Sequence, residues 1–91
     1  MKMGEGFSAE LDGLHMVVQV MEDGWYYRII PTKGGTALLD WTRGPAPSTS
    51  NYQEPEDVKF EAITSAIGLL SRKDDPHELL RRLQWRQFGA S

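Results

Sequence analysis

The chain has 91 residues, enough for one small domain, and its 40% apolar and 25% charged residues are typical of folded globular proteins. It has no cysteine, which excludes disulfides, thiolate metal sites and thiol catalysis and favours a reducing, cytoplasmic location. No apolar run approaches the roughly 18 residues that cross a bilayer, and the first residues lack the apolar stretch of a secretory signal. We therefore expect no membrane contact.

The net charge of −3 is distributed unevenly along the chain. Residues 1–71 hold five basic and ten acidic side chains, a balance of −5. Residues 72–91 hold five basic and three acidic side chains, a balance of +2. The body of the protein should therefore repel polyanions, whereas the C-terminal part should tolerate them.

Two Asp-Gly pairs organise the first half of the chain. Asp12-Gly13 and Asp23-Gly24 both favour two-residue hairpin turns, because a type I′ turn needs positive φ at both central residues. They predict three antiparallel strands, at about 7–11, 14–22 and 25–31.

These two turns place one set of apolar residues on a single face of the predicted sheet. Two-residue loops pair Phe7 with Val18 across the first turn and Val18 with Ile29 across the second. Side chains alternate between the faces of a strand, so all such pairs share one face. That face carries Phe7, Ala9, Leu11, Leu14, Met16, Val18, Val20, Trp25, Tyr27 and Ile29.

The opposite face of the predicted sheet is mixed rather than polar. His15 lies there across from Glu10, which predicts a cross-strand polar pair rather than a metal ligand. The same face has more apolar surface than solvent exposure alone requires, which makes it a candidate contact surface. Its candidate contact residues are Val17, Met21, Tyr26, Arg28 and Ile30.

A third turn leads into a fourth strand at about 36–41, and its register has two alternatives. A three-residue loop at 33–35 places Trp41 on the apolar face and sets Arg28 opposite Asp40. A loop of two or four residues places Trp41 beside Tyr26 on the other face instead. We favour the first register, because it buries more apolar surface and pairs a charge.

A connection and an amphipathic helix follow the fourth strand. Residues 42–53 are rich in Pro, Ser and Thr without periodicity, which predicts a mobile loop. Residues 55–72 carry apolar side chains along one broad side, with Lys59 as the exception, and predict a helix packed across the apolar sheet face. The ends of the chain, 1–5 and 89–91, are expected to be disordered. The prediction is therefore a single α+β domain over residues 1–91, built on a four-stranded antiparallel meander.

A second helix is predicted at about 76–88, because Asp75 is a good N-cap, Pro76 suits the first position and Gly89 is a helix stop. Besides a narrow leucine stripe, its helical spacing forms a second stripe of basic and aromatic residues. The candidate partner-binding residues on this helix are His77, Arg81, Arg82, Trp85, Arg86 and Phe88.

The second stripe has three explanations. Trp85 and Phe88 can fold back onto the domain, with Arg81 stacked on Trp85. They can anchor a protein partner, including a second copy of the chain, because Trp and Arg are typical interface anchors. They can also bind single-stranded nucleic acid by stacking and phosphate contacts, although the acidic body opposes this.

No catalytic pattern is present in the sequence. The two histidines, His15 and His77, have no ligand at metal-binding spacing, and no phosphate-loop or dinucleotide motif occurs. We therefore expect neither an enzyme nor a cofactor or metal. The sequence predicts a small binding module that acts through a protein partner, with single-stranded nucleic acid as the alternative ligand.

Overall fold

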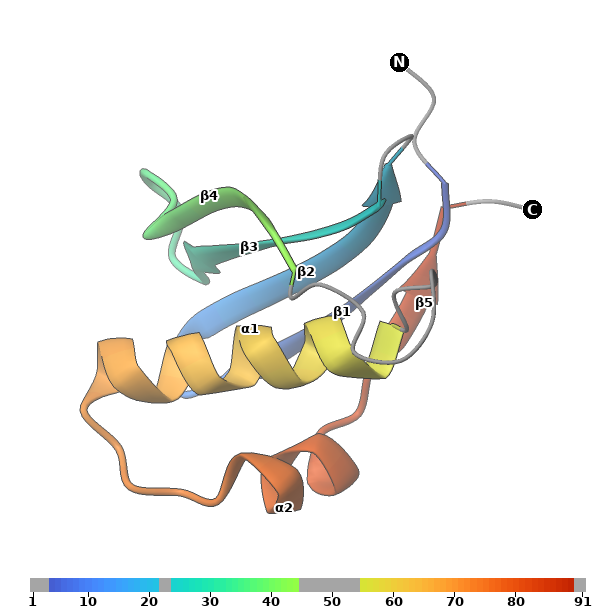
Figure 1. Ribbon diagram of the computed structural model, residues 1–91. Helices are drawn as coiled ribbons and strands as arrows, with labels where there is room; N and C mark the ends of the chain where they lie inside the picture. The colour runs from blue at the N-terminus through green and yellow to red at the C-terminus, as the bar shows by residue number, and fades with distance from the viewer. Residues whose placement is uncertain (1–3, 22–23, 45–54, 90–91) are drawn as a thin grey trace.

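The computed structural model describes residues 4–21, 24–44 and 55–89 (Figure 1). They form a five-stranded antiparallel sheet, in the order β4-β3-β2-β1-β5, and two helices. The predicted α+β class, the meander and the packing of a helix on the sheet are confirmed. The elements are β1 (Gly6–Leu11), β2 (Leu14–Met21), β3 (Gly24–Pro31), β4 (Leu39–Arg43), α1 (Pro55–Leu70), α2 (Pro76–Arg82) and β5 (Arg86–Phe88).

The first hairpin forms with the predicted register. Leu11 pairs with Leu14, and Phe7 pairs with Val18. Asp12 and Gly13 both have positive φ, at 48° and 83°, as a type I′ turn requires. The local sequence of this turn therefore determines how β1 and β2 align.

The second hairpin is shifted by two residues from the predicted register. Val18 pairs with Tyr27 rather than with Ile29, and Met21 pairs with Gly24. Gly24, at φ 141°, is thus the first residue of β3 rather than part of the turn. Residues 22–23 lie outside the described residues. A shift of two residues preserves the alternation, so the predicted faces are correct although the predicted pairs are wrong.

β4 combines the two predicted registers through an irregularity in its pairing. Ile29 pairs with Leu39, as the favoured register predicts, but Tyr27 pairs with Thr42. Because Tyr27 faces the core, its partner Thr42 faces the same way and Trp41 lies on the opposite face. The expectation that Trp41 joins the apolar face is therefore wrong.

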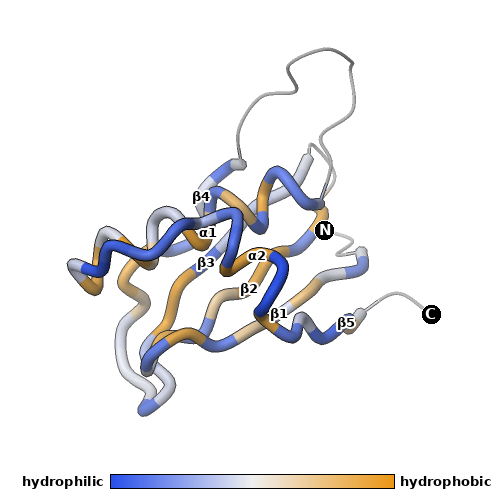
Figure 2. Tube along the Cα trace, turned by 90° about the horizontal axis from the view of Figure 1, so that it is seen from below, coloured by the Kyte–Doolittle hydropathy of each residue, from blue (hydrophilic) through white to orange (hydrophobic). Residues whose placement is uncertain are grey.

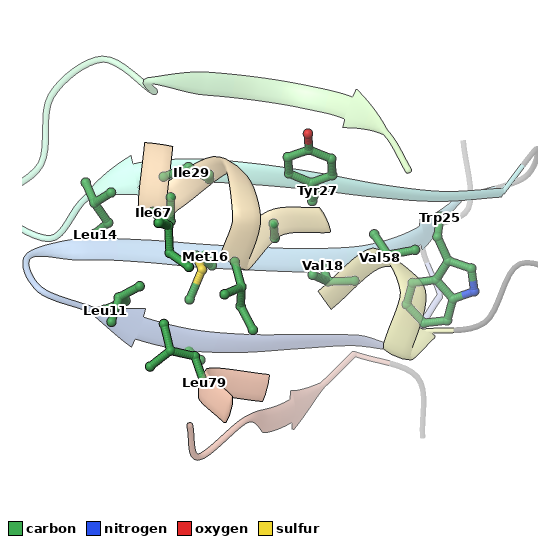
Figure 3. Packing of buried hydrophobic residues seen from close by; sticks show 14 residues of the cluster. Leu11, Leu14, Met16, Val18, Trp25, Tyr27, Ile29, Val58, Ile67 and Leu79 are labelled. Atoms are coloured by element: carbon green, nitrogen blue, oxygen red, sulfur yellow. The ribbon is translucent and has the colours of Figure 1, made fainter. Parts of the chain in front are cut away.

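The core lies between the sheet and the helices, which occupy the same side of it (Figure 1). α1 packs on β2 and β3, and Leu79 of α2 joins the same cluster of buried side chains (Figure 3). Seen from the helix side, α1 and α2 both carry hydrophilic and hydrophobic segments (Figure 2). The fully or almost fully buried apolar residues are Ala9, Leu11, Leu14, Met16, Val18, Trp25, Tyr27, Ile29, Val58, Ala62, Ile63, Ala66, Ile67 and Leu79.

α2 begins as predicted but ends earlier. The Asp75 carboxylate accepts a hydrogen bond from the His77 amide at 3.0 Å, and Pro76 opens the helix. The helix ends at Arg82, because Leu83 takes an extended conformation (φ −69°, ψ 141°). Residues 86–88 then pair with β1 as a fifth strand, so the prediction of a helix through residue 88 is wrong for this segment.

Several predictions concern residues at the margins of the described part of the chain. Most of the predicted loop at 42–53 lies outside the described residues, although Thr42 and Arg43 belong to β4. Residues 1–3 and 90–91 also lie outside them. Gly4 is described, and its amide donates a hydrogen bond to the Val20 carbonyl at 3.1 Å. The pairing of the first strand with β2 therefore extends to this residue.

Candidate functional site

The face of the sheet that points away from α1 and α2 is called the outer face here. Both described helices lie on the other side of the sheet, so no described helix packs on it (Figure 1). The five predicted contact residues of the sheet lie on this face, because each pairs with other outer-face positions. Val17 pairs with Ser8 on one side and with Arg28 on the other. All five are half-buried: Val17, Met21, Tyr26, Arg28 and Ile30.

The irregularity in β4 adds two residues to the outer face. Asp40 and Trp41 both lie opposite Arg28. The Arg28 Nε atom is 3.1 Å from the Asp40 carboxylate, and the guanidinium carbon is 5.7 Å from the centre of the Trp41 ring. Arg43 follows on the same face, where it pairs with Tyr26. A cation between a carboxylate and an aromatic ring is held in place from both sides.

β5 brings two of the predicted tail residues to the same outer face. Arg86 pairs with Ser8, and Phe88 pairs with Gly6. The Phe88 ring covers Gly6 so closely that a Cβ atom at Gly6 would lie 2.5 Å from its Cζ atom. Phe88 is 37% exposed, and Arg86 is exposed. Two predicted surfaces, one on the sheet and one on the tail, are thus partly continuous in space.

Trp85 points the other way and packs against the core. The cation beside it is Lys59 of α1, whose Nζ atom is 5.4 Å from the Trp85 ring centre and 4.0 Å from the Phe7 ring centre. Lys59 is 8% exposed and also pairs with Glu56 at 2.9 Å. The predicted fold-back of Trp85 onto the domain therefore occurs, but with a different cation than Arg81.

The remaining predicted tail residues stay on α2, away from the outer face. His77 lies against Phe60 of α1, with ring centres 4.6 Å apart. Arg81 forms an ion pair with Glu78 in its own helix, and Arg82 is exposed. The structure thus divides the predicted tail surface, because only Arg86 and Phe88 join the outer face.

A groove of about 550 Å³ lies where β5 leaves β1. A smaller hollow of about 230 Å³ lies beside the turn after β3. The two hollows share Glu10 and His15, whose carboxylate and Nδ1 atoms are 3.9 Å apart, as the predicted cross-strand pair requires. The groove is lined by Ser8, Ala9, Glu10, His15, Gln84, Trp85 and Arg86.

The net charge of the outer face is opposite in sign to the net charge of the whole chain. Its described residues include three arginines and two carboxylates, whereas the whole chain has a net charge of −3. The described residues form no group of three or more His, Cys, Asp or Glu side chains that could hold a metal ion. No helix among them is long and apolar enough to cross a membrane.

An ion pair outside the outer face ties the helix layer to the first turn. The Arg72 guanidinium donates two hydrogen bonds to Asp74, at 2.6 and 2.9 Å, and lies 3.5 Å from Asp12. The hydrogen bond from Arg72 lowers the pKa of Asp74, and the hydrogen bond to Asp74 raises the pKa of Arg72. Arg72 and Asp74 are half-buried and Asp12 is exposed, and the three side chains link elements rather than form a site.

Sequence reasoning missed Trp41 and Arg43 as outer-face residues, and it missed the burial of Lys59. The alternative register placed Trp41 on the correct face. However, nothing in the alternation of apolar and polar residues indicates that the register changes within β4. Comparisons with known proteins add nothing to this picture: no family model, no curated protein and no solved structure matches the chain.

Proposed function

We propose that the chain is a non-enzymatic binding module that contacts a protein partner, including a second copy of itself, through the outer face of the sheet. One observation carries the proposal. A sheet with a solvated face normally carries polar side chains there. This outer face instead carries apolar or aromatic residues on four of its five strands, all but β1.

The chemistry of these residues fits a protein contact. Interfaces are enriched in aromatic side chains, methionine and arginine. The outer face combines the Arg28–Trp41 stack with Tyr26, Met21 and Phe88. Arginines and carboxylates lie on the same face. Two copies related by a two-fold axis can therefore pair the arginines of one copy with the carboxylates of the other.

Sedimentation equilibrium over a wide concentration range tests this proposal. Val17→Lys puts a charge in the middle of the outer face, and Leu69→Lys is the matched control, because Leu69 is 47% exposed on α1. We expect the wild-type protein to associate, Val17→Lys to raise the dissociation constant by at least about tenfold, and Leu69→Lys to leave it unchanged.

Two results would contradict the proposal in different ways. A strict monomer at every concentration would exclude self-association. Equal association of Val17→Lys and Leu69→Lys would exclude the outer face as the contact surface.

Single-stranded nucleic acid is the second candidate ligand, and the change of register in β4 favours it. Trp41 lies on the outer face with Arg28 and Arg43, which provides an aromatic platform beside cations. Stacking on such a platform contributes roughly 1–3 kcal/mol per base. The acidic chain opposes it, so binding should be weak and should fall steeply with salt.

A fluorescence-anisotropy titration with labelled oligonucleotides at low salt decides between the two ligands. Binding that is lost in Trp41→Ala, and whose salt dependence decreases in Arg43→Gln, would support nucleic acid. The absence of binding even at low salt would exclude it and leave the protein partner.

A further inference from the structure

The edge of β1 that faces β5 is only half covered. β1 extends from Gly6 to Leu11, but its pairing with β5 ends at Ser8, opposite Arg86. Residues 9–11 have no strand beside them on this edge among the described residues. Uncovered strand edges offer backbone groups to which another chain can pair.

The backbone of Glu10 points to this open edge. In an antiparallel pair, the hydrogen-bonding groups of successive residues point alternately to the two edges of a strand. The Glu5 carbonyl accepts a hydrogen bond from the Val20 amide of β2 at 3.1 Å. Glu10 lies an odd number of residues further along the same regular pairing, so its amide and carbonyl face away from β2.

The groove of about 550 Å³ occupies the space beside this open edge. Ser8, Ala9 and Glu10 form one wall, and Gln84, Trp85 and Arg86 form the other. The chain passes from α2, on the core side of the sheet (Figure 1), to β5, which begins at Arg86. Within the described part of the chain, no strand therefore continues the line of β5 next to residues 9–11. The volume is in the range of sites that bind drug-sized molecules.

We propose that this groove binds an extended segment of a protein partner, which continues the line of β5 by pairing with residues 9–11. This is strand addition, in which backbone hydrogen bonds provide affinity and alternate side chains provide specificity. The inference rests on the proposed protein-binding function, but it assigns the sheet edge rather than the outer face.

The side chains of β1 specify the segment that fits. Glu10 lies on the outer face with an exposed carboxylate, whose described ionic neighbour is His15 at 3.9 Å. A strand residue opposite Glu10 should therefore be lysine or arginine. Ala9 and Leu11 are buried residues of the core face. The residues opposite them should be apolar, so the expected pattern is apolar, basic, apolar.

Two short peptides test the inference by ¹⁵N NMR titration of the full chain. The first is acetyl-Thr-Val-Lys-Val-Thr-amide, and the matched control peptide has glutamate in place of lysine. We expect the lysine peptide to shift amide signals of residues 8–11 and 84–86 and to slow the hydrogen exchange of the Glu10 amide. The lysine peptide should bind about fivefold more tightly than the glutamate peptide, the effect of one cross-strand charge pair.

Charge reversal in the protein sharpens the test. Glu10→Lys should invert the preference between the peptides, whereas Glu61→Lys, the same charge change on α1, should leave it unchanged. Three results would overturn the inference: no shifts with either peptide up to its solubility limit, shifts confined to other residues, or a preference that Glu10→Lys does not alter. The protein-binding function would survive any of them if Val17→Lys still weakened association, so the two proposals fail separately.

Discussion

The two faces of the sheet carry the same residue types in different surroundings. Ile29 and Ile30 are neighbours in β3, yet Ile29 is fully buried beneath α1 and Ile30 is half-buried on the outer face. Val18 and Val17 differ in the same way in β2. The inner residues are explained by the core of a small domain. The outer residues have no such explanation among the described elements, which is why we assign them to a contact.

The largest expected effect is the difference in stability between alanine substitutions at Ile29 and at Ile30. Ile29→Ala should lower the free energy of unfolding by about 2–5 kcal/mol, because it leaves a cavity in the core. Ile30→Ala should lower it by about 1 kcal/mol or less, because its side chain is only partly removed from water. Urea denaturation measures both. Equal costs would mean that the outer face is packed as tightly as the core.

The next effect concerns the strand that joins the tail to the outer face. Gly6→Ala should cost about 1–3 kcal/mol of unfolding free energy. The new Cβ atom would lie 2.5 Å from the Phe88 ring and 2.8 Å from the Val18 carbonyl oxygen. In a Phe88→Ala background the same change should cost less, because only the backbone contact remains. An identical cost in both backgrounds would mean that Phe88 does not lie over Gly6 in solution.

A smaller effect is expected at Lys59, the buried cation of the helix layer. Lys59→Met keeps a long apolar stem between the Phe7 and Trp85 rings but removes the charge. The cation–π contribution rises from about 0.5–1 kcal/mol at exposed sites to about 2 kcal/mol where the cation is removed from water, as Lys59 is, so Lys59→Met should cost up to about 2 kcal/mol. Lys59→Ala should cost more, because packing is lost as well. Thermal denaturation of the two variants checks this order.

The smallest effect is expected at the half-buried surface ion pair of Arg72 and Asp74. The hydrogen bond from Arg72 lowers the pKa of Asp74 below its ordinary value of 3.8. Its stabilising contribution should therefore be present above pH 3.8 and be lost as the pH falls through the lowered pKa. Asp74→Asn should slightly lower the melting temperature near neutral pH and have no effect in strong acid. A melting temperature of Asp74→Asn that stayed below that of the wild-type protein in strong acid would contradict this role of the ion pair.

The same comparison shows what the sequence could predict. The faces of β1, β2 and β3 follow from alternation, which survives a register shift of two residues such as the one at Met21 and Gly24. The first turn follows from the positive φ that Asp12 and Gly13 adopt. Both features depend on local rules, and both were predicted correctly.

The features that sequence reasoning missed depend on contacts between distant parts of the chain. Residues 83–88 continue a helical pattern, but pairing with β1 and the packing of Trp85 against the core favour an extended segment. The change of register at Trp41 lets Arg28 contact both Asp40 and Trp41, which no periodicity reveals. The five sheet residues of the candidate site were therefore predicted on the correct face, whereas the positions of Trp41 and the tail residues required the three-dimensional structure.

Methyl NMR signals over a dilution series give the most direct test of the outer face as a contact surface. Val17 and Ile30 report on the outer face, Ile63 on the core, and Leu69 on the exposed side of α1. We expect the signals of Val17 and Ile30 to shift with protein concentration, while those of Ile63 and Leu69 stay constant. Concentration-dependent shifts at Leu69 without shifts at Val17 and Ile30 would contradict it, because association would then use the helix layer.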